Sequence, residues 1–110
     1  MYSLVSQVSN IKMTINSILE ELKTATHPVA KALHKGVHFR VLVIGFNAGM
    51  VLKDHKAHMA SKLTVIKGSV QYVEDGKETI MHLYDEMEIP VDITHSVSAV
   101  EDSLCILTQG

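Results

Sequence analysis

The chain has 110 residues, of which 46% are hydrophobic and 20% charged, and its formal net charge at pH 7 is −2. This length and balance are typical of one folded domain and exclude a disordered chain. The nearly neutral charge, without a run dense in Lys and Arg, gives no electrostatic basis for binding nucleic acid.

The sequence also shows no pattern of export or membrane insertion. Residues 1–12 lack a basic start followed by an apolar block, so we predict no signal peptide. No apolar run is long enough to span a bilayer. Cys105 is the only cysteine, so no internal disulfide can form. We therefore expect a cytoplasmic protein that binds neither membranes nor nucleic acid.

The first predicted element is a short helix near the N-terminus. Between Asn10 and Lys23 the apolar residues recur at helical spacing and form one stripe, composed of Ile11, Ile15, Ile18, Leu19 and Leu22. The pattern ends before Pro28, because the residue before a proline disfavours helical geometry. We expect residues 1–36 to form an N-terminal helical segment that packs on the rest of the domain. A contact between two copies of the chain is a second role for the same stripe.

From about Val37 onward the pattern is that of β-strands. Residues 37–46 are rich in β-branched side chains and apolar on both faces, which predicts a buried strand. Further short strands are predicted at residues 63–66, 70–73, 79–83, 87–90, 95–99 and 104–108. The stretch Glu-Asp-Gly-Lys at residues 74–77 indicates a hairpin turn. Short, regularly spaced strands without a helix between them favour an antiparallel sandwich or barrel over residues 37–110.

Glycines and histidines follow a definite spacing in the first half of this region. Gly49 is followed by five residues and then His55. Ala57 lies two positions beyond His55, and Ser61 lies four beyond Ala57. Gly68 follows seven positions after Ser61. We treat these five positions as one pattern.

A second pattern begins fifteen residues after the first one ends. Tyr84 is followed by five residues and then Pro90. Asp92 comes two positions later and His95 three positions after that. Ala99 closes the pattern.

The two spacings resemble the two signature motifs of the cupin superfamily, G-x5-H-x-H-x3-E-x6-G and G-x5-P-x-G-x2-H-x3-N. Ala57 stands at the second histidine and Ser61 at the glutamate, while Tyr84, Asp92 and Ala99 stand at two glycines and the asparagine. The resemblance covers about residues 37–109. It implies an all-β fold with a short N-terminal helix, in which the strands form an antiparallel double-stranded β-helix, or jelly-roll barrel.

The resemblance also implies where a metal would bind. In metal-binding cupins the histidines and the glutamate of the two motifs hold the ion, and of these this chain keeps His55 and His95. His58 is a candidate third ligand if a bulge at residues 56–57 turns it to the side of His55. Such ligands suit zinc, iron, nickel or manganese. Two imidazoles alone are fewer than the three protein ligands of a catalytic zinc-type centre.

Two functions stay open at this point. In the first, the barrel binds a small organic ligand or senses a divalent metal without turnover, in an apolar pocket whose polar groups are these histidines with Ser61 and Tyr72. In the second, the chain is a metal-dependent enzyme of the oxygenase or isomerase type that holds its ion with His55, His58 and His95. No glycine-rich phosphate loop predicts a nucleotide cofactor, and no catalytic residue or substrate is indicated. A homodimer is expected, because small cupins commonly pair.

Overall fold

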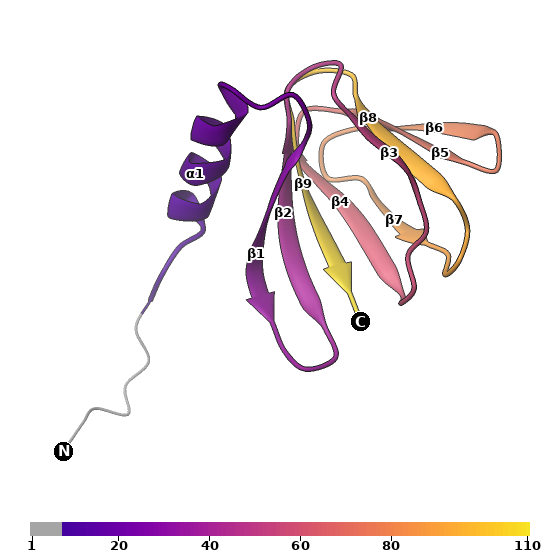
Figure 1. Ribbon diagram of the computed structural model, residues 1–110, viewed down its shortest axis with the longest axis horizontal. Helices are drawn as coiled ribbons and strands as arrows, with labels where there is room; N and C mark the ends of the chain where they lie inside the picture. The colour runs from indigo at the N-terminus through magenta and orange to yellow at the C-terminus, as the bar shows by residue number, and fades with distance from the viewer. Residues whose placement is uncertain (1–7) are drawn as a thin grey trace.

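Two antiparallel sheets facing each other, with a helix on the outside, form the fold (Figure 1). The computed structural model describes residues 8–110, without the side chains of residues 54 and 55. Its elements are α1 (Lys12–Leu22), β1 (Val29–Lys35), β2 (Arg40–Phe46), β3 (Val51–His55), β4 (Ser61–Lys67), β5 (Val70–Glu74), β6 (Lys77–Met81), β7 (Glu86–Ile89), β8 (His95–Ala99) and β9 (Ser103–Gln109). One sheet has the order β1-β2-β9-β4-β7 and the other β3-β8-β5-β6. The predicted all-β jelly-roll fold with a short N-terminal helix is confirmed.

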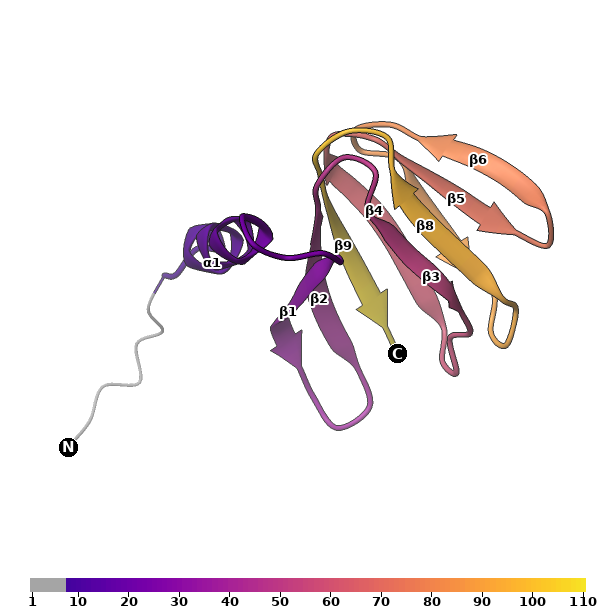
Figure 2. The same cartoon turned by 45° about the horizontal axis from the view of Figure 1, so that its top comes forward.

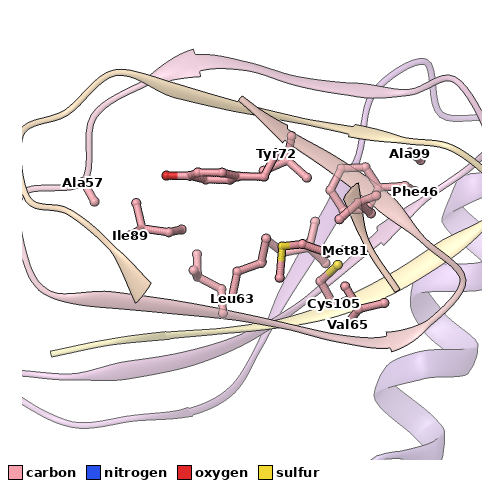
Figure 3. Packing of buried hydrophobic residues seen from close by; sticks show 13 residues of the cluster. Phe46, Ala57, Leu63, Val65, Tyr72, Met81, Ile89, Ala99 and Cys105 are labelled. Carbon is pink, nitrogen blue, oxygen red and sulfur yellow. The ribbon is translucent and has the colours of Figure 1, made fainter. Parts of the chain in front are cut away.

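Apolar side chains fill the space between the two sheets. Burial alternates along β4 and β8, as expected for strands that present one face to a core. The largest of the fully buried side chains are Tyr72 and Phe46. In Figure 3 the Tyr72 ring lies between the sheets, and its hydroxyl points toward the end where Ala57 and Ile89 lie.

Helix α1 packs against the outer face of the larger sheet, beside β1 and β2 (Figure 2). Ile18 is fully buried and Leu22 almost so. Gly45 on β2 makes this approach possible, because a Cβ there would lie 2.3 Å from Ile18 Cγ2. The predicted helix is confirmed, but its buried stripe is narrower, since Ile11 and Leu19 are each 41% exposed. No helix in the described part of the chain has the length and apolar character that crossing a membrane requires.

Two strands are absent from the sequence-based prediction. Strand β1 lies within the segment that was assigned to the N-terminal helical region, and β3 lies between two predicted elements. Both are edge strands of their sheets. Their sequences, VAKALHK and VLKDH, contain several charged or small residues of low β-propensity. Such residues are typical of edge strands that face water. Because their β-propensity is low, a prediction based on propensity does not find these strands.

The backbone confirms the glycine positions of the two motifs, including the two that carry another residue. Gly49 and Gly68 have φ values of 83° and 78°. Tyr84 and Asp92, which replace glycines, have φ values of 69° and 62°. Residues other than glycine seldom adopt this left-handed conformation. The turns of the motif have therefore kept their shape after the glycines were replaced.

Replacement of Tyr84 by glycine is expected to stabilise the protein. The left-handed conformation costs a non-glycine residue about 1–2 kcal/mol, and the Tyr84 side chain is 75% exposed, so its loss removes little packing. We expect Tyr84→Gly to raise the free energy of unfolding by about 1 kcal/mol in chemical denaturation. Tyr84→Ala is the control, because it removes the same ring but keeps the strain. A Tyr84→Gly variant no more stable than Tyr84→Ala would contradict this reading.

Candidate functional site

One end of the barrel brings four side chains into a row on the inner face of the larger sheet. Arg40 on β2 pairs with Gln109 on β9, Gln109 pairs with Ser61 on β4, and Ser61 pairs with Ile89 on β7. Directly paired residues of antiparallel strands project to the same face. Ser61 and Ile89 are buried, so this row faces inward. We call this end of the barrel, marked by Arg40, Gln109, Ser61 and Ile89, the mouth.

Hydrogen bonds connect the polar members of this row. Arg40 Nε donates to Gln109 Oε1 at 2.5 Å, and Gln109 Nε2 donates to Ser61 Oγ at 3.2 Å. Ser61 Oγ in turn donates to the Met59 carbonyl oxygen at 3.0 Å. These two bonds fix the orientation of the Gln109 side-chain amide, because one holds its oxygen and the other its nitrogen. The chain of bonds runs from an exposed guanidinium to a buried hydroxyl.

His95 belongs to the facing sheet and is buried. It begins β8, its exposed fraction is 2%, and its ring stacks on Tyr72 with ring centroids 5.7 Å apart. His95 Nδ1 lies 3.1 Å from the Ile93 carbonyl oxygen. A carbonyl oxygen only accepts, so in the neutral ring this bond places the proton on Nδ1 and the lone pair on Nε2. The second-motif histidine is therefore a fixed, inward-facing group.

Glu74 joins this sheet face, although the sequence indicated only a turn there. Tyr72 Oη donates to Glu74 Oε1 at 2.7 Å. Burial, with a smaller contribution from Glu74, raises the pKa of Tyr72 well above its ordinary value of 10. Glu74 also pairs with His95 in the register of β5 and β8. The sequence held one signal for this contact: Glu74 is two residues from Tyr72, and residues two apart on a strand project to the same face.

Of the three predicted metal ligands, His95 is buried and His58 is on the surface. His55 pairs with His95 through the backbone register of β3 and β8, but its side chain lies outside the described residues. The His58 side chain is 85% exposed, and its Nδ1 lies 3.1 Å from Asp92 Oδ1. Ala57 is the residue of this loop that is buried in the core, so its neighbour His58 is on the surface instead. The structure therefore separates His58 from His95.

The described side chains do not fit a divalent metal centre. Among residues 8–110, the side chains of 54 and 55 set aside, no three His, Cys, Asp or Glu residues are grouped so that they could hold a metal ion. Ala57 offers no donor, and Ser61 offers a neutral hydroxyl that is already bonded to Met59 and Gln109. A catalytic metal site normally uses three protein ligands. Metal binding therefore stays a prediction that depends on His55.

Two hollows of very different size meet at the mouth. The inner one is lined by apolar side chains together with His95, Ser61 and Gln109, and its volume is about 20 Å³. Such a volume holds about one water molecule. The outer one, the mouth groove, is lined by residues 39–41, 60–62, 88–91 and 108–110 and has a volume of about 780 Å³. Of these two hollows, the mouth groove has the size of a small-molecule site, and it shares Ser61, Ile89 and Gln109 with the inner hollow.

A second surface groove lies near the start of β8. It has a volume of about 490 Å³ and includes Lys56, Asp75 and Asp92. Neither Ser61 nor His95 lines it. It includes one motif position, Asp92, but shares no lining residue with the inner hollow.

Comparison with known proteins supports the fold. No family model matches the chain, and no curated protein sequence matches it. A cupin superfamily protein from Desulfitobacterium hafniense has a similar structure, with a TM-score of 0.73, 11% identity, and 76% of this chain and 77% of that chain covered. A cupin 2 conserved barrel domain protein from Leptotrichia buccalis gives a TM-score of 0.71 and 27% identity over 76% of this chain and 41% of that one.

A salicylate 1,2-dioxygenase from Pseudoaminobacter salicylatoxidans is also similar, with a TM-score of 0.83 and 14% identity over 92% of this chain and 32% of that one. The facing sheets and the motif turns define a cupin barrel. The chain has the fold of the cupin superfamily, so the fold that the sequence motifs implied is confirmed. The likeness to the dioxygenase is one of fold, and a fold does not carry a reaction with it.

The Tyr72 hydroxyl is expected to stay protonated beyond pH 10. Its folded-state pKa is raised above 10, so the stability that the protonated phenol contributes is present below pH 10 and is lost as pH rises above it. Ultraviolet titration of the folded protein should show one phenol that stays protonated past pH 10. Tyr72→Phe should remove this late phenol, whereas Tyr84→Phe should leave it. Ionisation of all phenols together near pH 10 would contradict the burial of Tyr72.

Proposed function

We propose that this chain binds a small organic molecule in the mouth groove and holds it without a covalent or redox step. One observation carries the proposal. The groove has the volume of a ligand site, and it shares three residues with the inner hollow onto which His95 faces. A ligand seated there would contact Ser61, one of the positions at which the family motifs place functional side chains, and would cover the entrance to the hollow that His95 lines.

The composition of the groove fits such a ligand. Its apolar wall includes Phe39, Ile89 and Val91, and the polar side chains that line it include Arg40 and Gln109. Phe39 and Val91 are 43% and 45% exposed. A ligand that covered these side chains would gain about 25 cal/mol for each Å² of apolar surface removed from water. The polar end would fix its orientation.

Turnover has less support than binding. The alternative of a metal-dependent oxygenase or isomerase needs a third donor, which the described side chains do not supply. Nucleophilic catalysis has no support at the mouth either. Ser61 Oγ donates its proton to a backbone carbonyl rather than to a general base. The mouth offers groups that bind and orient a ligand.

Binding of small molecules is expected at the mouth groove. We expect a set of small neutral and charged organic fragments, followed by ¹⁵N NMR, to shift the amide signals of Ser61, Ile89 and Gln109. Ala60→Trp should weaken this binding by about tenfold or more, because the indole occupies space in the groove. Ala32→Trp is the matched control, since Ala32 is exposed on β1 outside the groove. Responses confined to other surfaces, or an Ala60→Trp variant that binds as well as the native chain, would contradict the proposal.

Metal analysis separates binding from the enzyme alternative. After incubation with zinc, iron, nickel or manganese and removal of excess metal, we expect less than one equivalent to remain, because the described donors are too few. His95→Ala should not change that amount. A stoichiometric metal that is lost in His95→Ala would contradict the proposal and favour the metal-dependent enzyme.

A further inference from the structure

We infer that the mouth groove takes a carboxylate-bearing small molecule and that Arg40 is the anchor for its negative charge. The inference rests on the proposed function and adds the chemical class of the ligand. Its starting point is the row of paired residues at the mouth, in which a cation stands at one end of an otherwise neutral set, Gln109, Ser61 and Ile89.

The Arg40 guanidinium has donors left for a ligand. Arginine carries five N–H donors, and the structure uses Nε, which bonds to Gln109. No other hydrogen bond or ion pair of the Arg40 side chain is present within the described residues. The terminal nitrogens can therefore form the paired bonds that match the two oxygens of a carboxylate. The bond to Gln109 holds the head group at the groove.

The other charged side chains of the groove carry opposite charges. Lys62 and Glu88 line the groove and are directly paired in the register of β4 and β7. The Lys62 ammonium also lies 3.4 Å from Glu86 Oε1. Because both positions are one residue away from the inner row, they belong to the opposite face of the sheet. Arg40 is thus the charged residue of the inner row, and Lys62, Glu86 and Glu88 do not neutralise it.

A second cation stands beside Arg40. Lys35, at the end of β1, is the direct register partner of Arg40. Like charges directly opposite each other destabilise a pair of strands. No ion pair of Lys35 occurs in the described part of the chain. A bound anion would relieve this repulsion, and the pair therefore favours an anionic ligand over a neutral one.

The serine at position 61, where the family motif has a glutamate, also favours an anionic ligand. A glutamate at this position would place a negative charge on the inner row, one pairing away from Gln109. Ser61 is instead a neutral hydroxyl that accepts from Gln109. The row from Arg40 to Ser61 therefore carries no negative charge that would repel a carboxylate.

Hexanoate and hexanamide are the probes that test this inference. They have the same size and alkyl chain, so the comparison isolates the charge. We expect hexanoate to shift the amide signals of Arg40, Ser61 and Gln109 in ¹⁵N NMR titrations and to bind about tenfold or more tightly than hexanamide. Arg40→Gln should remove the difference between the probes. Arg40→Lys should keep only part of it, because an ammonium lacks the paired donors.

Lys67→Gln is the matched control for loss of a positive charge. Lys67 is exposed and lies at the opposite end of β4 from the mouth. This variant should bind hexanoate as the native chain does. Equal binding of the two probes, or hexanoate binding that Arg40→Gln leaves unchanged, would overturn the inference. If neutral fragments bind the mouth but hexanoate does not, the inference of a carboxylate ligand is overturned and the proposed function stands. If no fragment binds the mouth, both the inference and the proposed function are overturned.

Discussion

The placement of β9 between β2 and β4 is the constraint on which the mouth depends. Cys105 and Leu107 on β9 are buried between the sheets, and Gln109 continues the same inward alternation. A slip of one residue would turn both apolar side chains to the outside and Gln109 with them, so burial of the core fixes the register. Burial also raises the pKa of the Cys105 thiol to about 12, which keeps it protonated and unreactive. Packing in the middle of the larger sheet thus determines which side chains face inward at the mouth.

The filled interior decides where a ligand can lie. A barrel of this size can hold either its own side chains or one small ligand. Here Tyr72, Phe46 and their neighbours occupy the space and leave a hollow of about 20 Å³, against about 780 Å³ in the mouth groove. The changes at Ala57 and Ser61, where the family motifs have metal ligands, agree with this arrangement. Under the proposed function, the barrel is a rigid support for a site at its mouth.

The sequence predicted local features well and long-range neighbours poorly. The motif spacing located the left-handed turns at Tyr84 and Asp92, because turn geometry depends on a few adjacent residues. The edge strands β1 and β3 lacked a β-branched pattern and were missed. Arg40 escaped notice because its partner Gln109 lies 69 residues away, a pairing that no local pattern encodes. His58 was a candidate third ligand only if a bulge at residues 56–57 turned it inward, but the buried Ala57 takes that direction and the His58 side chain is on the surface.

A crystal structure of the protein bound to hexanoate tests the central claim most directly. The account predicts a carboxylate at the Arg40 guanidinium, an alkyl chain along Ile89 and Val91, and a barrel interior whose side chains keep their positions. A chain of density between the two sheets, with Leu63 or Val97 displaced to admit it, would contradict the account.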